Sequence, residues 1–422
     1  MPNETEPHRA PDDLRDPYPP TERIERQPRA EVGQSSFAGT ETVQTQAAVP
    51  RKSRAWILLA LVPVIASAAA AGWFGWPLYQ RHFKQTWIVD ASGGGDTATI
   101  ADAMSQAPDN ATILVRPGVY AESLAMDRSV QLKPAETEGE APVIAPPEGP
   151  CLIVRAKTGS VSGLRLQGPA PAVTPPPDTV PCIDIVASGV LVEGNEILNP
   201  AGPAIRIRAG AEPTVRGNTI TDTGGPGILI SSGAGGAVLD NKIRGAEKSG
   251  VIIAGGAAPR LAGNVIEDSG EAGVLFAEAA AGRFEDNVIR SSAASGIEVR
   301  ATADPVVTGN RIESAGEAGI FIYDLGKGRF ESNEVISSGY SGLVIASGGS
   351  PHFTANEIRD SKEHGILALG LSGGVIKDNT IAGNAGHGIA LAKEATVELG
   401  ANTLEENMEP QILQDWASKP QN

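Results

Sequence analysis

One spacing constrains the fold of this chain more than any other feature: asparagine recurs at intervals of 23 residues. The ten positions are Asn195, Asn218, Asn241, Asn264, Asn287, Asn310, Asn333, Asn356, Asn379 and Asn402. Each has an aliphatic residue two positions later, and a glycine column with the same period, from Gly227 to Gly388, follows nine residues behind. Apolar residues inside each unit alternate with a period of two, which indicates short strands. A unit this small cannot bury a core alone, so the units must stack.

The stacked units predict an all-β solenoid. Three short strands per 23-residue coil are expected, each paired in parallel with its equivalent in the next coil about 4.8 Å away. Regular coils are predicted over about 182–410. The asparagines are predicted to form a ladder that satisfies buried backbone groups at an inward corner. The glycines are predicted to be corner residues, either with positive φ or without room for a Cβ.

The composition of the chain before the coils changes twice. Residues 1–50 are rich in proline and mixed charge, which predicts a disordered cytoplasmic tail. Residues 55–79 carry no charge over 25 positions, so a single transmembrane helix is predicted within an anchor at 51–84. Basic residues before this run favour a cytoplasmic N-terminus, with the β domain in the periplasm or outside the cell. A cleaved signal peptide is the alternative.

Charge and cysteine content restrict the partners. The net charge of −16 argues against nucleic acid. Neither a metal nor a cofactor is predicted, and the two cysteines are too few for a disulfide framework. Cys151 and Cys182 open equivalent strands, separated by one coil plus an eight-residue insertion. Equivalent positions one coil apart suit a disulfide, and stacked free thiols are the alternative.

Three segments before the regular coils carry a resemblance to a known family. They are TIADAMSQAP at 99–108, TILVRPGVYAESLAM at 112–126 and SVQLKP at 129–134. They resemble the opening of the pectin-lyase-like right-handed parallel β-helix superfamily, and the repeats are similar to its carbohydrate-binding and sugar-hydrolase class. The resemblance implies a β-helix over 86–410 and a cap helix at about 97–107. Thr99 is its expected N-cap, and residues 411–422 are expected to form a C-terminal tail.

The resemblance leaves the activity open, because the superfamily contains lyases, hydrolases, esterases, epimerases and binding proteins. The motif sets of pectate lyases, polygalacturonases, pectin methylesterases and mannuronan epimerases are absent from this sequence. Gly386, His387 and Gly388 match one polygalacturonase fragment, but Gly388 belongs to the glycine column, so His387 is interpreted as the variable residue before it. The sequence therefore favours a protein that is not an enzyme.

In each coil, a predicted strand follows the glycine of the column, and its outward positions are mostly apolar. An apolar stripe of this length predicts a surface that binds a partner. Two alternatives are that another segment of the same chain buries the stripe, or that the apolar residues are exposed without a function. The candidate binding residues are Leu229, Ile252, Leu275, Phe321, Val344, Leu367, Arg300, Tyr323, Arg206 and Arg208. Of these, Arg206 and Arg208 either bind an anionic glycan or are simply solvated.

One polar cluster interrupts the stripe. Glu298, Arg300, Tyr323 and Asp324 fall on adjacent coils. Glu298 and Asp324 are the catalytic candidates, because sugar chemistry uses carboxylates in pairs. A surface ion pair of Arg300 is the alternative. The favoured function is a membrane-anchored envelope module that binds or scaffolds a protein or polysaccharide partner. A glycan-modifying enzyme is the competing hypothesis.

Overall fold

The computed structural model describes residues 84–136, 139–171, 180–186 and 189–416. The predicted tail at 1–50 and the apolar run at 55–79 lie outside these residues. Among the residues described, no helix is both long and apolar enough to cross a membrane.

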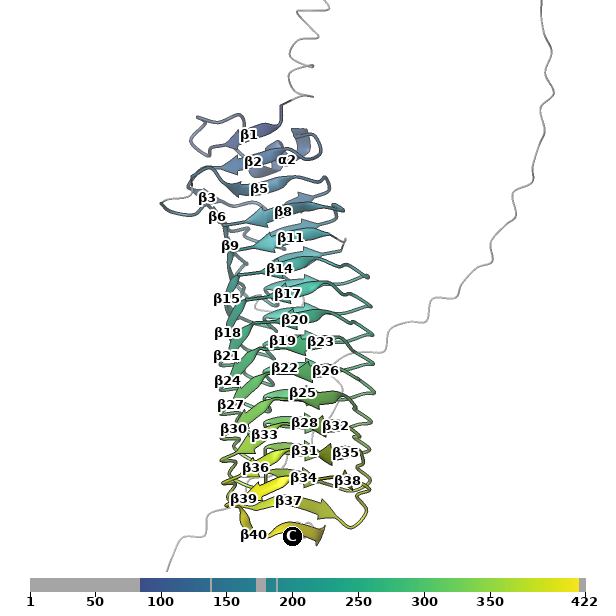
Figure 1. Cartoon of the computed structure of the whole chain (residues 1–422). Helices are drawn as coiled ribbons and strands as arrows, with labels where there is room; N and C mark the ends of the chain where they lie inside the picture. The colour runs from purple at the N-terminus through teal and green to yellow at the C-terminus, as the bar shows by residue number, and fades with distance from the viewer. Residues whose placement is uncertain (1–83, 137–138, 172–179, 187–188, 417–422) are drawn as a thin grey trace, which may run out of the picture. The chain divides into compact units, whose positions relative to one another are not determined.

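Within the described residues, three parallel sheets run along the solenoid (Figure 1). Sheet A has 14 strands and sheets B and C have 13 each. The strands of sheet A are β1 (Thr86–Val89), β2 (Thr112–Val115), β5 (Gln131–Pro134), β8 (Gly159–Ser162), β11 (Val190–Glu193), β14 (Thr214–Arg216), β17 (Ala237–Leu239), β20 (Arg260–Ala262), β23 (Arg283–Glu285), β26 (Val306–Thr308), β29 (Arg329–Glu331), β32 (His352–Thr354), β35 (Val375–Lys377) and β38 (Glu398–Leu399). The strands of sheet B are β3 (Val119–Tyr120), β6 (Val143–Ile144), β9 (Arg165–Gln167), β12 (Glu196–Leu198), β15 (Thr219–Thr223), β18 (Lys242–Ala246), β21 (Val265–Glu267), β24 (Val288–Arg290), β27 (Arg311–Glu313), β30 (Glu334–Ile336), β33 (Glu357–Arg359), β36 (Thr380–Ala382) and β39 (Thr403–Glu405). The strands of sheet C are β4 (Leu124–Met126), β7 (Leu152–Val154), β10 (Ile183–Ile185), β13 (Ile205–Ile207), β16 (Ile228–Ile230), β19 (Val251–Ile253), β22 (Val274–Phe276), β25 (Ile297–Val299), β28 (Ile320–Ile322), β31 (Leu343–Ile345), β34 (Ile366–Ala368), β37 (His387–Ala392) and β40 (Met408–Trp416).

The predicted register is confirmed by the strand pairing. Ile228 pairs with Val251, which pairs with Val274, so each step along sheet C is one 23-residue coil. Inward residues such as Ile228 and Val251 are fully buried. Aromatic residues also fill the interior, where Phe330 and Phe353 stack with ring centroids 5.8 Å apart. The core is therefore a continuous apolar column rather than one centre.

The asparagine ladder is also confirmed. Asn218 donates from its side-chain amide to the Oδ1 of Asn241 at 2.9 Å and to the carbonyl of Val192 at 3.0 Å. Its backbone N–H also donates to the Oδ1 of Asn241, at 3.0 Å. The same contacts repeat coil after coil, so the corner between sheets A and B has its polar groups bonded.

A second buried column, which sequence reasoning missed, lies between sheets B and C. It is formed by Thr223, Ala246, Ser269, Ser292, Ala315, Ser338, Ser361, Asn384 and Asn407. Asn384 donates to the Oδ1 of Asn407 at 2.8 Å, so the column ends in a short amide ladder. The residue type changes along this column, which hid its 23-residue period.

The two ends of the described solenoid differ. Helix α2 (Ile100–Gln106) covers the first coils and buries Ile100, Ala103 and Met104. The side chain of Thr99 accepts a hydrogen bond from the N–H of Asp102, as an N-cap does. At the other end, residues 411–416, predicted to begin a C-terminal tail, complete strand β40.

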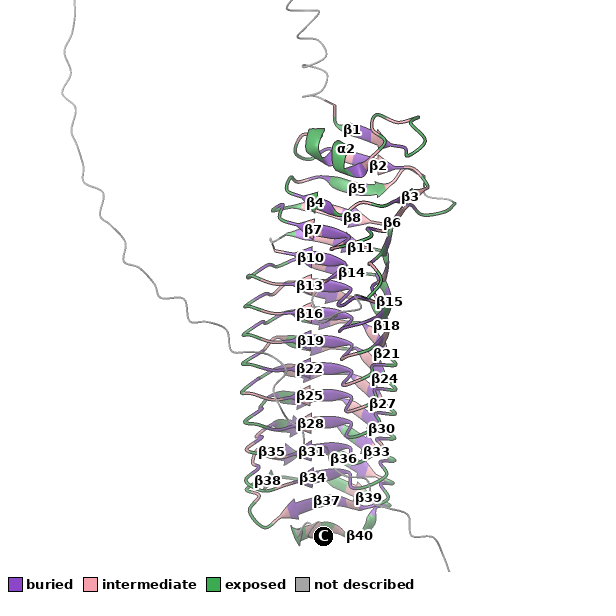
Figure 2. Cartoon of the chain, turned by 180° about the vertical axis from the view of Figure 1, so that it is seen from behind, coloured by how far each residue is buried: buried purple, intermediate pink, exposed green. Residues whose placement is uncertain are grey.

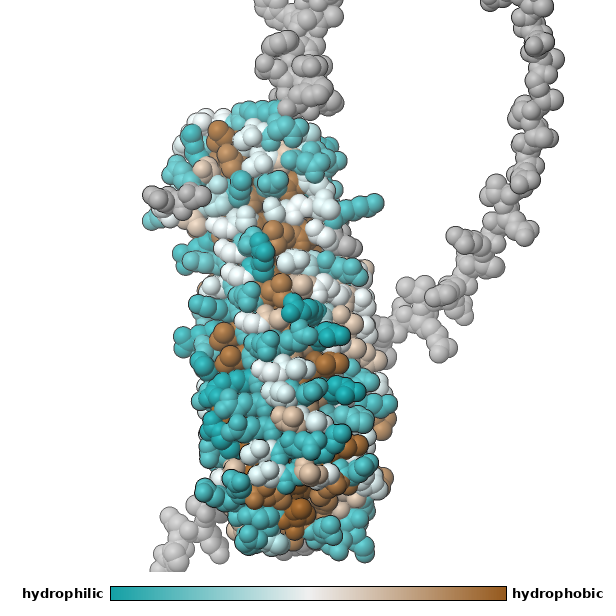
Figure 3. All heavy atoms as spheres, in the orientation of Figure 1, coloured by the Kyte–Doolittle hydropathy of each residue, from teal (hydrophilic) through white to brown (hydrophobic). Residues whose placement is uncertain are grey.

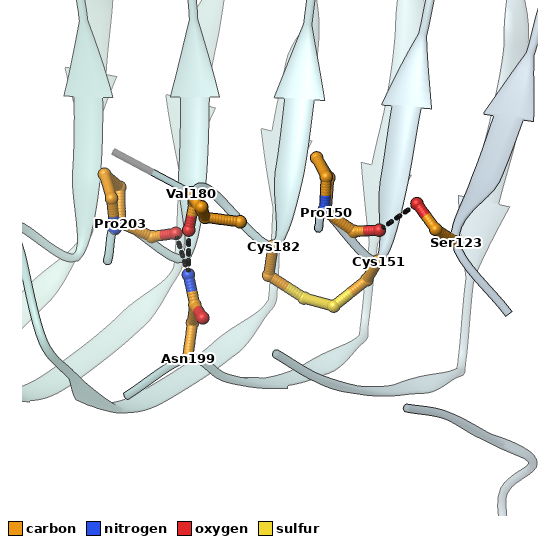
Figure 4. The surroundings of a disulfide bond; sticks show 7 residues. All are labelled: Ser123, Pro150, Cys151, Val180, Cys182, Asn199 and Pro203. Carbon is orange, nitrogen blue, oxygen red and sulfur yellow. Dashed lines mark hydrogen bonds between the residues drawn. A yellow bond between two sulfur atoms is a disulfide. The ribbon is translucent and has the colours of Figure 1, made fainter. Parts of the chain in front are cut away.

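Cys151 and Cys182 are joined by a disulfide between adjacent coils, with Cα atoms 4.7 Å apart (Figure 4). Asn199 lies beside it and donates to the carbonyls of Val180 at 2.9 Å and Pro203 at 2.6 Å. The disulfide and Asn199 together hold the coils on either side of the proline-rich insertion.

Candidate functional site on the outer face of sheet C

The outer surfaces of sheets A and B are polar. Arg290 on sheet B pairs with Glu267 at 3.4 Å and with Glu313 at 3.6 Å. Further along, Glu334 pairs with both Arg311 and Arg359. Figure 3 shows a largely hydrophilic surface on the side that faces the viewer in Figure 1. Charged faces of this kind are ordinary solvated surfaces, so they do not single out a binding site.

Sheet C differs because its outward side chains form two apolar clusters. The first joins Ile252, Leu275 and Ala277, with Leu229 and Ala254 packed against them. The second contains Ala318, Val344, Leu367 and Ala390, with Phe321, Leu369 and Leu413 packed against them. Sheet C is mainly buried in Figure 2, and the exposed fraction of Val344 is 4% and that of Leu367 is 0%. Much of the predicted stripe is therefore less accessible than the sequence pattern indicated.

Glu298, Arg300 and Tyr323 occupy the gap between the two clusters. Glu298 pairs in register with Leu275 on one side and Phe321 on the other. The hydroxyl of Tyr323 donates to the Oε2 of Glu298 at 3.3 Å. The ring of Phe321 stacks on that of Tyr323, with centroids 4.2 Å apart and planes inclined by 19°. A carboxyl group, a phenol and an aromatic surface therefore lie together.

The surroundings of Glu298 favour its neutral form. Burial raises its pKa, and the charge of Glu317 raises it further. The charge of Arg300 and hydrogen bonds from Tyr323 and Ser295 oppose this rise without cancelling it. Burial also raises the pKa of Tyr323, and the charge of Glu298 adds to that rise. Both side chains are therefore held toward their neutral, protonated forms.

Asp324 lies in a different setting. It is exposed, in a turn after β28 with φ of 45°. Its charge contributes to the raised pKa of Tyr323, whereas the carboxylate that raises the pKa of Glu298 is that of Glu317. Glu317 was missed from sequence, although a signal exists: it stands two residues before Gly319, at the corner beside sheet C.

Arg300 supplies a positive charge to the cluster. Its Nε is buried and, within the described part of the chain, has no hydrogen-bond partner. The alternative predicted from sequence was a surface ion pair of Arg300 with an acid. The charge of Arg300 lowers the pKa of Glu298, and its side chain is half-buried.

Arg206 and Arg208 lie closer to the N-terminal end of the same face and converge on Asp184. Their Nη2 atoms are 2.8 Å and 2.9 Å from its Oδ2. Burial opposes ionisation of Asp184, but the hydrogen bonds from the two arginines prevail and lower its pKa. Sequence reasoning missed Asp184 because it precedes Arg206 by 22 residues, not 23, so it falls outside the regular columns.

Other candidate chemistry is weaker. Among the residues described, no group of three His, Cys, Asp or Glu side chains could hold a metal ion. His364 and His387 stack with ring centroids 5.4 Å apart, and the backbone N–H of His387 donates to the Nδ1 of His364 at 3.0 Å. This pair therefore contributes to coil stacking near the C-terminal end.

Comparison with known proteins identifies relatives of the fold. The family model described as right handed beta helix region matches residues 181–324 and 295–418. A mutant of the periplasmic alginate epimerase AlgG matches with a TM-score of 0.55 at 10% identity, over 76% of this chain and 86% of that one.

Two further solved structures are similar. The complex of XylC with xylose gives a TM-score of 0.53 at 13% identity, over 77% of this chain and 87% of the other. The catalytic unit of a GH87 alpha-1,3-glucanase from Streptomyces thermodiastaticus gives 0.55 at 13% identity, over 73% and 65%. No curated protein matches the sequence. At these identities the similarities establish the fold alone.

Proposed function

Because this chain belongs to the family of right-handed β-helix region proteins, we propose that it binds and modifies an acidic polysaccharide on the outer face of sheet C. The observation that carries the proposal is the cluster of Glu298, Arg300 and Tyr323 between two apolar clusters. Similar structures include an alginate epimerase and an alpha-1,3-glucanase, which supports a carbohydrate as the substrate class.

Each residue of the cluster has a chemical role in this proposal. Arg300 pairs with the carboxylate of a uronic acid unit and offsets its charge. Glu298 transfers a proton to or from the sugar, since burial raises the pKa of its carboxyl group and favours the protonated form. Tyr323 is a positioning residue that holds the Glu298 carboxyl through its hydroxyl. The flat ring of Phe321 offers a surface on which a sugar ring can pack.

The experiment is turnover of uronic-acid polymers by the wild type, Glu298→Gln and Glu331→Gln. Glu331 is an exposed outward glutamate on sheet A, so it serves as the matched control. General acid–base catalysis contributes roughly 10²- to 10⁴-fold, so Glu298→Gln should lose at least about 100-fold in kcat while Glu331→Gln keeps its rate. Absence of turnover by the wild type, or an unchanged rate for Glu298→Gln, would refute the catalytic proposal.

A non-catalytic binding module is the second candidate. It is favoured by the apolar side chains that stay partly accessible on sheet C, Phe321 and Leu369 among them. Replacing Phe321 by Glu tests this function, because Phe321 is only partly buried whereas Leu367 is fully buried and its replacement would disturb the fold. Binding of a polysaccharide that is lost in Phe321→Glu, without turnover by the wild type, would assign the module function.

The location proposed for the β domain is outside the cytoplasm, anchored by the apolar segment at 55–79. The disulfide between Cys151 and Cys182 supports an oxidising compartment. Protease added to intact and to permeabilised cells tests this location. Cleavage of the β domain only after the inner membrane is opened would contradict it.

A further inference from the structure

An apolar notch lies on the same face, one coil beyond Tyr323. Two columns form it, and in each a small residue stands between two larger ones. The first column is Tyr323, Ala346 and Leu369, of which Ala346 and Leu369 line the notch. The second is Leu325, Gly348 and Leu371, in which the Leu325 side chain leans over Gly348. The hollow has a volume of about 510 Å³. It is lined by Leu325, Ala346, Ser347, Gly348, Leu369, Gly370 and Leu371.

The side chains around the notch are unusually exposed for their type. The exposed fraction is 54% for Leu325 and 79% for Leu371. In the neighbouring strands β31 and β34, the outward Val344 and Leu367 are buried. The accessible apolar surface of this region is therefore concentrated at the rim of the notch, where a bound group would remove it from water.

The chemistry of the lining restricts the occupant. Ser347 contributes a hydroxyl, and the other lining side chains are leucine, alanine or glycine. No charged side chain belongs to this lining, so a sugar carboxylate would lose its hydration there without an ionic partner. A small apolar group attached through a polar link suits both the leucines and the hydroxyl.

We infer that the notch is a subsite for an O-acyl substituent of the bound polysaccharide, which makes an acylated uronic-acid polymer the preferred substrate. This inference rests on the proposed function. Ala346 follows Tyr323 by one coil, a step of about 4.8 Å, so a chain lying along the solenoid past Glu298 also passes the notch. The acyl methyl packs between Leu325 and Leu371, and the hydroxyl of Ser347 donates to the ester carbonyl.

The test compares the binding of O-acetylated alginate with that of the same alginate without acetyl groups, by titration calorimetry on the full chain. Wild type should bind the acetylated polymer roughly fourfold more tightly, as expected for burial of one methyl group. Ala346→Leu places a larger side chain in the notch, where the acyl methyl would pack, and should bring the two affinities together. Ala254→Leu is the matched control, since Ala254 occupies the same register position four coils earlier and is also partly buried. This control should keep the preference.

A second variant protects the test against misfolding. Leu371→Asn alters a side chain that is 79% exposed, so its fold should be unaffected while the preference falls. Equal affinities in the wild type, or a preference retained in both Ala346→Leu and Leu371→Asn, would overturn the subsite and leave the proposed function standing. If neither polymer binds, the proposed function fails and the subsite fails with it.

Discussion

At the scale of single residues, Glu298 makes the stability of the fold depend on pH. Its pKa in the folded chain is raised above the ordinary value of 4.5, chiefly by burial. The stabilising contribution of its neutral form is therefore complete below pH 4.5 and is lost as the pH rises through the folded-state pKa. Glu298→Gln cannot ionise at this position. The difference between its free energy of unfolding and that of the wild type should therefore shift in favour of the variant as the pH rises from 4 toward neutrality.

Urea unfolding followed by circular dichroism at a series of pH values measures this difference. Glu331→Gln, at an exposed position of sheet A, is the control for replacing a glutamate outside the cluster. A constant gap between Glu298→Gln and the wild type at every pH would show that Glu298 is solvated like an ordinary surface glutamate.

Gly273 shows how a single missing Cβ permits the stacking. A Cβ there would lie 2.4 Å from the Cγ2 of Ile289 and 2.7 Å from the carbonyl oxygen of Gly296. Gly273→Ala should therefore cost about 1–3 kcal/mol through overpacking. Gly233 has open space around it and a φ of +68°, so Gly233→Ala should cost only about 1 kcal/mol through backbone strain. Chemical denaturation of both variants checks the order, and equal losses would contradict it.

The glycine column also marks a limit of sequence reasoning. The sequence predicted corner glycines but left positive φ and lack of space as alternatives. Gly273 has no room for a Cβ and lies outside the left-handed region, which decides the question for this position. Spacing alone does not carry this information, because the obstructing Ile289 and Gly296 belong to the next coil.

At the scale of repeating elements, the asparagine ladder is a chain of mutually dependent hydrogen bonds. Asn287 donates to the carbonyl of Leu261 at 3.2 Å and to Asn310 at 3.0 Å. Its own Oδ1 accepts from the N–H of Asn264 at 2.9 Å. Asn287→Ala leaves several of these buried groups without partners, at about 1–3 kcal/mol for each. The expected loss is therefore about 3 kcal/mol in the free energy of unfolding.

Asn402 tests whether the cost of removing an asparagine depends on its position in the ladder. It is only half-buried and stands at the last rung, so Asn402→Ala should cost about 1 kcal/mol. Thermal and urea unfolding of both variants measure the difference. Equal losses at Asn287 and Asn402 would mean that the rungs act independently of their burial.

The 23-residue columns also explain which elements could be predicted. Strands, register and ladder follow from a period that every coil repeats, so sequence reasoning reached them directly. Asp184 was not predicted because its coil is one residue short. Glu317 was not predicted because it lies at a corner where residue types vary. The candidate site was therefore only partly predictable: Glu298, Arg300 and Tyr323 lie in the outward columns of sheet C, whereas Glu317 lies in a corner column whose residue type changes from coil to coil.

At the scale of the whole solenoid, each coil contacts mainly its neighbours, so a local change should weaken a local group of coils. The outward residues of sheet C show what the columns do not predict. The alternation of residues along each strand predicted which side chains point outward, but it did not predict that Leu367 would be fully buried. Burial on the outer side depends on side chains from several coils and corners, which one column does not describe.

The disulfide allows a test of this local behaviour. Cys151 and Cys182 enclose a separation of 31 residues, for which the loss of the cross-link should cost about 4 kcal/mol. In a solenoid, this loss should fall on the coils from β7 to β13 and leave those around β25 and β28 almost unchanged. Hydrogen exchange of the wild type and of a variant with both cysteines replaced by alanine measures protection strand by strand. A uniform loss of protection from β7 to β37 would show instead that the solenoid opens as one cooperative unit, with the N-terminal coils controlling the stability of the site at Glu298.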